Sequence, residues 1–365
     1  MSWIKNILLL ATSSVLTIIV CNFLVHIYLE HYKNSKPWIL ESEEIKFYRK
    51  YENQVNHLRN PNLKFKSPHL YKSTEDLMFS RLSEENVSNS ILITGDSWGE
   101  RFAFDTTSYQ KLKNHALNNK VSFTLSGTTS YSPTLLGIQS RILKEDFNLS
   151  FSEAFIVVDN TDIGDELCRY RRFIGKNYNG DKVVYRFSAD DKMKTYMNDT
   201  FLYVSEVLSL DDYALLKLAK LIMRKIRTRL VKSTECGWAE ISKYFYKMSE
   251  SEIQYFETTV EFMIKEIKRN NPNVTIHILT IPHRKHVTGE YKNSTEKLIR
   301  KVLDDNNYSN VNLVDFSEKI NELLTSGSSL DDIFIIGDRA SHLTSFGHNA
   351  LLVPFITTAT RRGMY

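Results

Sequence analysis

Short apolar runs recur along the C-terminal three quarters of the chain. They are five or six residues long and rich in β-branched and aromatic side chains, which is typical of buried strands, and they cover residues 90–94, 121–125, 154–158, 274–279 and 311–316. The stretches between and after them have helical periodicity and predict helices over residues 134–144, 251–270, 294–305 and 345–358. Strands that alternate with helices predict an α/β domain: a parallel, doubly wound sheet in three layers, with helices on both faces.

The N-terminal part of the chain has a different pattern. Residues 7–29 carry no charged side chain over 23 positions, and about 20 apolar residues in a helix are enough to cross the hydrocarbon core of a bilayer. Secretory signal peptides have shorter apolar cores, and no small-residue cleavage site follows this run. We therefore expect a short tail at 1–6 and a retained transmembrane anchor at 7–29, with the rest of the chain on the exported (periplasmic or extracellular) side. A buried core helix is the alternative.

The region between the anchor and the first strand is polar. Residues 30–74 carry many charges and are interrupted by Pro37, Pro61 and Pro68. Prolines at such spacing disfavour long regular elements. We interpret this region as a stalk with some helix, followed by a single α/β domain over residues 75–365.

The alternation of strands and helices pauses over about residues 169–248, which predicts an insertion into the domain. Residues 213–232 within it have the pattern of an amphipathic helix with a basic face. Such a helix either packs on the core as a lid or lies on an anionic bilayer surface. Cys168 and Cys236 bracket much of this insertion. An exported domain permits them to form a disulfide, and two free thiols are the alternative.

The composition is that of an ordinary globular protein. Charged residues make up 25% of the chain and apolar residues 42%, which excludes a disordered chain and a protein with many membrane spans. The net charge of +4 is small. A nucleic-acid-binding protein would concentrate Lys and Arg on one face beside a groove-reading motif. The sequence has no such motif, so we expect no nucleic-acid partner.

A candidate nucleophile follows the first predicted strand. Gly95, Asp96 and Ser97 come directly after it, which places Ser97 at the strand's carboxyl end, where doubly wound folds have their active sites. A serine hydroxyl becomes an effective nucleophile when an imidazole accepts its proton and a carboxylate orients that imidazole. His342 and Asp338 lie four residues apart on one loop before the last predicted helix. We therefore expect Ser97 as the nucleophile, His342 as the base and Asp338 as the carboxylate.

These two blocks resemble the SGNH/GDSL hydrolase family, and the resemblance extends over about residues 90–358. Gly95-Asp96-Ser97 matches the family's nucleophile block, and the loop from Asp338 to His342 matches its terminal block. The resemblance implies a flavodoxin-like, three-layer SGNH fold. It also implies a serine hydrolase that needs no cofactor.

The family's middle blocks supply an oxyanion hole, and two segments of this chain resemble them. Gly127, in Gly127-Thr128-Thr129-Ser130, is in the place of a glycine whose backbone N–H is a donor. Asn160 and Thr161 are where the family has Gly-x-Asn-Asp. The resemblance thus implies that the N–H groups of Ser97 and Gly127 and a group from Asn160 or Thr161 stabilise the oxyanion.

The sequence departs from the family pattern at two places. Thr161 is found where the family has asparagine, with Asn160 one residue early. The family's usual spacing is Asp-x-x-His, but Asp338 lies one residue farther from His342, and Arg339 occupies the usual position. His348 is an alternative base, although we expect it to lie inside the last helix and to face packing or solvent.

Three further groups of polar residues have simpler interpretations. Asp162 and Asp165 lack the regular spacing of a metal site, so we expect no metal. Asp96 is interpreted as a structural hydrogen-bond acceptor. His283 and His286 follow the fourth predicted strand in a basic loop. They are interpreted as solvated, with a contact to substrate as the alternative.

Two functions of different classes fit these observations. The first is a membrane-tethered serine esterase that acts on acyl esters, in particular acetyl esters, of a cell-surface glycan, or that transfers the acyl group to a sugar hydroxyl. Its partner is then an acylated carbohydrate. The second is a catalytically weak glycan-binding or assembly module of a polysaccharide-export system, which the departures at Thr161 and Asp338 favour.

Overall fold

The computed structural model describes residues 13–14, 17–25, 27, 42–59, 72–82, 89–185, 236, 238–291 and 294–362. The chain divides into two compact units, and each is considered by itself. One unit comprises residues 1–40 and 187–235, and the other comprises residues 41–186 and 236–365.

The described part of the first unit is helical at residues 13–14, 17–25 and 27. Large apolar side chains of this part, including Ile18, Phe23 and Leu24, are more than half exposed. Within the described residues, no helix meets the length and hydropathy needed to cross a bilayer. Parts of 7–29 lie outside the described residues, so the anchor stays a prediction. The predicted amphipathic helix at 213–232 also lies outside them.

The second unit is built on a six-stranded sheet. Its strands are β1 (Ser80–Leu82), β2 (Asn89–Gly95), β3 (Val121–Leu125), β4 (Glu153–Asp159), β7 (Thr275–Ile281) and β8 (Val311–Asp315). They are ordered β1-β3-β2-β4-β7-β8 across the sheet. The five strands from β3 to β8 pair in parallel, and β1 pairs antiparallel to β3 at one edge.

This topology is that of an α/β fold. In chain order the five parallel strands lie in the sequence 2-1-3-4-5, an order found among doubly wound sheets. The prediction of a wholly parallel sheet is wrong at the edge, where β1 makes the sheet mixed. Three residues at Ser80–Leu82 are too few to produce a recognisable strand period.

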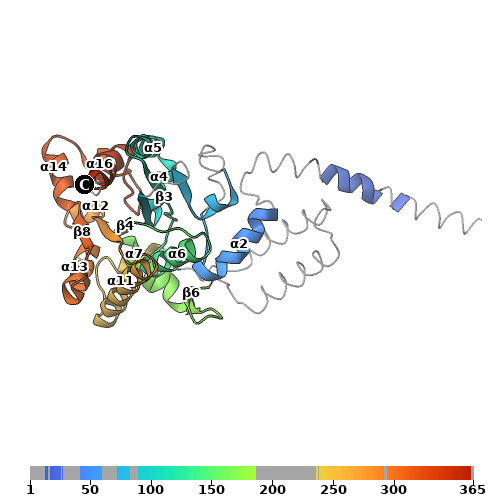
Figure 1. Ribbon diagram of the computed structural model, residues 1–365, viewed down its shortest axis with the longest axis horizontal. Coiled ribbons are helices and arrows are strands. Elements are labelled where there is room, and N and C mark those ends of the chain that lie inside the picture. Colours follow the sequence, from blue (N-terminus) through green and yellow to red (C-terminus); the bar gives the residue numbers. More distant parts are fainter. Residues whose placement is uncertain are drawn as a thin grey trace, which may run out of the picture. The chain divides into compact units, whose positions relative to one another are not determined.

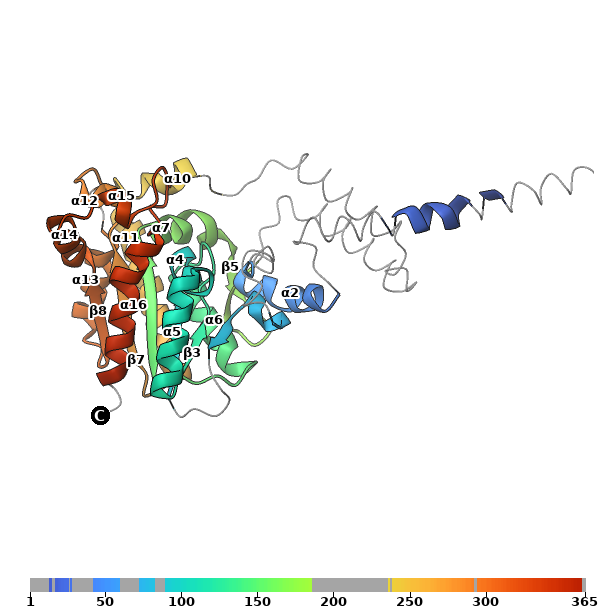
Figure 2. The same cartoon turned by 90° about the horizontal axis from the view of Figure 1, so that it is seen from above.

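Helices cover both faces of the sheet in the layers that Figure 1 shows. The long helices of one layer are α5 (Thr106–Asn119) and α16 (Ser345–Arg362), which lie side by side in Figure 2. The opposite layer contains α6 (Pro133–Glu145), α11 (Glu250–Asn270) and α13 (Thr295–Asn306), with α11 packed against both of the others. Helices on both faces confirm the predicted α/β class.

The strand side chains alternate between these two layers, as the pleat of a strand requires. Ile91, Ile93, Phe155 and Val157 belong to the core beneath α5 and α16, together with Leu112 and Leu352. All of them are fully or almost fully buried. The central strands are apolar on both faces because neither face meets water, and this is why their positions are visible in the sequence.

Shorter elements connect the layers. They are α4 (Ser97–Phe104), α7 (Thr161–Gly164), α10 (Trp238–Lys243), α12 (Arg284–Val287), α14 (Ser317–Thr325) and α15 (Leu330–Ile333). The segment after α7 continues through a π-helical turn η2 (Asp165–Tyr170) and a 3-10 turn η3 (Arg171–Phe173), then a two-stranded hairpin of β5 (Ile174–Lys176) and β6 (Lys182–Val184).

The predicted stalk boundary needs correction. Helix α2 (Ser42–Val55) and the 3-10 turn η1 (Thr74–Leu77) belong to the same compact unit as the sheet. Tyr51, Val55 and Arg59 are 2% exposed or less, and α2 packs against α6 and β6. The unit therefore begins at residue 41 rather than 75. The buried residues Tyr51, Val55 and Arg59 recur every four positions in an otherwise polar region, so the sequence pattern did not reveal them.

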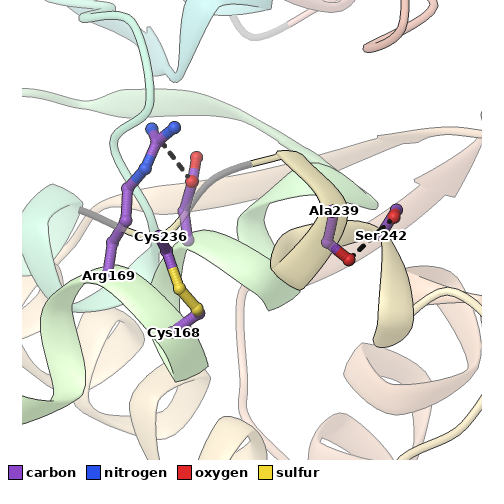
Figure 3. The surroundings of a disulfide bond; sticks show 6 residues. Cys168, Arg169, Cys236, Ala239 and Ser242 are labelled. Carbon is purple, nitrogen blue, oxygen red and sulfur yellow. Dashed lines mark hydrogen bonds and ion pairs between the residues drawn. A yellow bond between two sulfur atoms is a disulfide. The ribbon is translucent and has the colours of Figure 1, made fainter. Parts of the chain in front are cut away.

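Cys168 and Cys236 form a disulfide that connects η2 to a position two residues before α10, with 5.8 Å between the two Cα atoms. Figure 3 shows the bond beside Arg169, which pairs with Asp165 at 3.1 Å. On the other side, the Ser242 hydroxyl donates to the carbonyl oxygen of Ala239 at 3.2 Å within α10. The bond crosslinks the two ends of the segment between residues 168 and 236. The sequence left a disulfide and two free thiols as alternatives, and the structure contains the disulfide.

Candidate active site

Ser97 begins helix α4 directly beyond the carboxyl end of β2. The turn between them uses Gly95 at φ +149°, a conformation that favours glycine, and a Cβ there would lie 2.6 Å from the carbonyl oxygen of Val157. Asp96 caps the helix, because its Oδ1 accepts the N–H of Trp98 at 2.9 Å. Ser97 is therefore the first residue of α4.

Asp338 and His342 lie on the loop between α15 and α16. Asp338 Oδ2 accepts from the His342 backbone N–H at 2.7 Å and lies 2.5 Å from its Nδ1. Ser341 has φ +59°, which lets the chain turn back on itself between the two. The extra residue of the Asp338-to-His342 spacing is thus absorbed by a tight loop.

The carboxylate of Asp338 is held in its charged form. Burial raises its pKa, but the hydrogen bonds from the ring and the backbone N–H of His342 outweigh burial and lower the pKa to about 2. An ionised Asp338 accepts the Nδ1 proton of His342. The other ring nitrogen, Nε2, is then free to accept a proton.

Nε2 of His342 lies 2.5 Å from Oγ of Ser97. Ser97 Oγ is also 2.9 Å from Oδ2 of Asp96, so two acceptors compete for one serine proton. Burial, followed by the charge of Asp159, raises the pKa of Asp96 well above its ordinary value. A raised pKa favours the uncharged form of Asp96, which accepts hydrogen bonds less well than a carboxylate does.

Two backbone N–H groups near the nucleophile are unpaired as far as the structure describes the chain. The Ser97 N–H belongs to the first turn of α4, where no preceding turn supplies an acceptor. Gly127 packs so closely on this turn that a Cβ would lie 2.1 Å from the Glu100 nitrogen. Among the described residues, neither the Ser97 N–H nor the Gly127 N–H donates a hydrogen bond. Both are donors suited to an anionic oxygen.

The side chains of Asn160 and Thr161 are used within the fold instead. The Thr161 hydroxyl and N–H both donate to Asp159 Oδ1, at 2.6 and 2.8 Å. Asn160 Oδ1 accepts from the Thr295 hydroxyl at 2.8 Å, and its Nδ2 lies 3.3 Å from Nε2 of His286. Both side chains are buried. Of the predicted oxyanion donors, the N–H groups of Ser97 and Gly127 are therefore unoccupied within the described part of the chain. The side chains of Asn160 and Thr161 make hydrogen bonds within the loop, and their oxyanion role stays a prediction.

Three buried carboxyl groups lie beneath the nucleophile. One oxygen from each of Asp96, Asp159 and Asp162 lies within 4.8 Å of the others. Burial raises the pKa of all three. Carboxylates at this spacing are also a donor set that a hard divalent cation accepts. The expectation that the protein binds no metal stays a prediction.

His348 lies in α16 and is fully buried. Its Nδ1 is 2.8 Å from the Ser108 hydroxyl, and its ring packs edge-on against Phe102 with 4.2 Å between centroids. Burial, with a smaller effect from Arg101, lowers its pKa to about 4. The alternative base is therefore a neutral core histidine, packed as expected.

His283 is also buried, although the sequence had favoured a solvated residue. Its Nδ1 accepts from the Lys285 N–H at 3.0 Å, so its proton is on Nε2. That nitrogen lies 3.0 Å from the Arg339 carbonyl oxygen and 2.9 Å from the Ser341 hydroxyl. His283 thus connects the end of β7 to the loop that carries Asp338 and His342.

Two residues at the site were not anticipated. Arg59 donates to the loop that carries Gly127, and Arg101 lies one helical turn beyond Ser97. No local motif marks Arg59, because its partners are distant in the chain. Arg101 would have followed from the helical period if α4 had been predicted, since residues i and i+4 share a helix face.

Comparison with known proteins gives few matches. No family model matches the chain, and no curated protein matches it in sequence. Among solved structures, the chain is similar to an acetyl xylan esterase from the rumen bacterium Butyrivibrio proteoclasticus, with 7% sequence identity and a TM-score of 0.36. The similarity covers 77% of this chain and 65% of that one, so this chain spans about two thirds of the length of that structure. A likeness this low says nothing about the activity of this chain.

Proposed function

We propose that this protein is a serine esterase of the SGNH type. The observation that carries the proposal is the contact between Ser97 Oγ and His342 Nε2, whose other ring nitrogen is held by an ionised Asp338. The block around Ser97 and the terminal block around His342 are 245 residues apart in the chain, yet they meet at the carboxyl edge of the sheet. A serine, a histidine and a carboxylate within hydrogen-bond reach of one another are the groups that a serine hydrolase needs, and the packing of the fold does not require them at this edge of the sheet.

The geometry supports a double-displacement reaction. Ser97 Oγ attacks the acyl carbonyl carbon and gives its proton to His342 Nε2. The carbonyl oxygen becomes an anion that accepts from the N–H groups of Ser97 and Gly127, and each such donor lowers the barrier by about 3 kcal/mol. Collapse expels the sugar oxygen, which takes the proton from His342, and leaves the acyl group on Ser97.

A second displacement completes the cycle. A water molecule gives a proton to His342 and attacks the acyl-serine, and collapse returns the proton to Ser97 Oγ as the acid departs. If a sugar hydroxyl replaces water, the same steps transfer the acyl group. We propose acyl esters of a glycan, in particular acetyl esters, as substrates, with residues 7–29 tethering the enzyme to a membrane on its exported side.

Variants of the three residues test the enzyme proposal. Ser97→Ala and His342→Ala are expected to lower kcat for p-nitrophenyl acetate by at least a thousandfold, and Asp338→Asn by a similar or smaller factor, because triad members act as a unit. Fluorophosphonate labelling should require Ser97. Ser150→Ala, at an exposed serine between α6 and β4, is the matched control. Equal activity of Ser97→Ala and the parent protein would rule out the mechanism.

The second candidate is a catalytically weak glycan-binding or assembly module. One observation favours it: the side chains of Asn160 and Thr161, two of the predicted oxyanion donors, make hydrogen bonds within the fold. The same labelling experiment separates the candidates, because a binding module would not react at Ser97. Acetylated glycans with and without an acceptor sugar then distinguish hydrolysis from transfer.

A further inference from the structure

An open cavity of about 520 Å³ lies over the nucleophile. It is lined by Ser97, Arg101, Phe104, Asp105, Thr106, Thr107, Ile335 and His342. Besides Ser97 and His342, the lining combines one cation, one carboxylate, two threonine hydroxyls and two apolar side chains. Such a surface suits a sugar, which presents hydroxyls at its rim and C–H groups on its faces, but a sugar alone does not require the cation.

Arg101 is the cation, and helix α4 sets its position. It follows Ser97 by four residues, so the two side chains leave the same face of the helix about 5 to 6 Å apart at their Cβ atoms. The side chain of Arg101 is partly buried. Burial lowers the pKa of its guanidinium from the ordinary value, although an arginine remains charged at neutral pH.

The guanidinium of Arg101 lacks a partner in the described part of the chain. Its Nε is buried without a hydrogen bond. No carboxylate of a described residue lies within 4.0 Å of its nitrogens. A partly buried guanidinium with an unused buried N–H is unfavourable unless a ligand satisfies it.

The two carboxylates whose charges act on Arg101, Asp105 and Asp338, accept hydrogen bonds from other donors. Asp105 Oδ1 accepts from the Ser108 N–H and hydroxyl, both at 2.8 Å, and from the Asn349 amide at 3.2 Å. Asp338 is held by the ring and backbone of His342. Both carboxylates reduce the local positive potential without filling the hydrogen-bonding positions of Arg101.

We propose that Arg101 binds an anionic group of the substrate, a carboxylate or a phosphate, on the sugar that carries the ester or on its neighbour. This inference rests on the proposed esterase function and narrows its substrate to acidic glycans. A guanidinium binds either anion through two parallel N–H donors. Arg101 and Ser97 line the same cavity, so one sugar residue can present its ester to Ser97 and its anion to Arg101.

Paired substrates that differ only in charge provide the test. The first pair is a mono-acetylated methyl glucuronoside and the corresponding uncharged glucuronamide, and the second is a mono-acetylated glucose 6-phosphate and the corresponding acetylated glucose. We expect the parent protein to release acetate from the anionic member of at least one pair with a kcat/KM at least tenfold higher. The pair with the larger ratio identifies the anion as carboxylate or phosphate.

Arg101→Gln is expected to bring that ratio close to one. Arg101→Lys should retain part of the ratio, since lysine keeps the charge but loses the two parallel N–H donors. If Arg101→Gln does not fold, the ratio measured with Arg101→Lys decides the question. Arg81→Gln, at an exposed arginine of β1 outside the cavity, is the matched control and should keep the ratio of the parent protein. A parent ratio of one or less in both pairs, or a ratio unchanged in Arg101→Gln, would overturn the inference.

Binding to the Ser97→Ala variant separates this inference from the proposed function. Calorimetric titration of that variant should show tighter binding of the anionic sugar than of its neutral counterpart, and the added Arg101→Gln change should remove the difference. If the difference is present but the parent protein releases no acetate, the anion site stands and the esterase proposal fails. If acetate is released and Arg101 makes no difference to binding or rate, the esterase proposal stands and the anion site fails.

Discussion

Nε of Arg59 donates to the carbonyl oxygen of Gly127 at 2.8 Å. The same guanidinium donates from Nη2 to the Leu125 carbonyl oxygen at 2.6 Å and from Nη1 to the Ser80 hydroxyl at 3.1 Å. Arg59 is 2% exposed. A residue that follows α2, in the region predicted to be a stalk, therefore holds the loop that positions the Gly127 N–H beside Ser97.

Arg59→Met should lower both stability and activity. The substitution leaves buried carbonyl oxygens without donors, and hydrogen bonds to a charged group are worth about 1.5 to 3 kcal/mol each. We expect the free energy of unfolding to fall by about 3 kcal/mol in urea titrations. We also expect kcat for p-nitrophenyl acetate to fall at least tenfold in the folded fraction. Arg81→Met is the exposed control, and equal effects of the two variants would contradict the role of Arg59.

His283 should act on the reaction through the loop that it holds. His283→Ala removes the contacts to Arg339 and Ser341, and a displacement of about 1 Å in a reacting group can cost a hundredfold in rate. We expect kcat to fall ten- to a hundredfold with a smaller change in KM. The rate of fluorophosphonate labelling at Ser97 per folded molecule should fall with it.

A conservative variant distinguishes positioning from general destabilisation. His283→Gln keeps an N–H donor and should recover part of the labelling rate. A merely structural role would reduce the folded fraction and leave the labelling rate of each folded molecule unchanged. That result would remove His283 from the site.

The parallel strands could be predicted from the sequence because their environment is uniform. Segments such as Ile91–Ile93 and Phe155–Val158 are buried on both faces and therefore consist of continuous apolar residues. Helix α5 was missed for the opposite reason. Its buried face is made by Leu112 and Ala116 together with polar and aromatic residues, which do not form a clear apolar stripe.

The sequence predicted only those site residues that have a reactive side chain and also lie next to the end of a predicted strand or helix. Ser97 and His342 lie next to a strand end and a helix start, so their placement at one edge followed from topology. Arg59 and His283 act through contacts with residues 68 and 56 to 58 positions away. Such contacts have no local signature, and only the folded structure reveals them.

The disulfide should stabilise the folded protein measurably. Cys168 and Cys236 are separated by 68 positions, and a crosslink across a loop of this length typically contributes about 2 to 4 kcal/mol by restricting the unfolded chain. The double variant Cys168→Ser and Cys236→Ser should lose this amount in urea unfolding. Dithiothreitol should destabilise the parent protein by a similar amount and leave the double variant unaffected. A parent protein that is insensitive to reduction would show that the bond contributes nothing.

The stability of the protein should depend on pH through His348. Burial lowers its pKa to about 4 in the folded state, whereas an unfolded histidine has a pKa of about 6.5. Below pH 6.5 the unfolded chain therefore binds a proton that the folded protein does not. The contribution of neutral His348 is fully present above this value and is lost as the pH falls through about 4. The difference of about 2.5 pKa units corresponds to about 3 kcal/mol.

His348→Gln isolates this contribution, because glutamine does not titrate and every other ionisable group remains. At pH 7 the parent protein should be the more stable of the two in urea titrations. The gap should shrink by about 3 kcal/mol between pH 7 and pH 4, while kcat/KM for p-nitrophenyl acetate at pH 7 stays within about twofold of the parent value, since His348 bonds to Ser108 and not to Ser97. A gap that is constant across this range would mean that His348 keeps an ordinary pKa in the core. A thousandfold loss of activity in folded His348→Gln would instead make it the base.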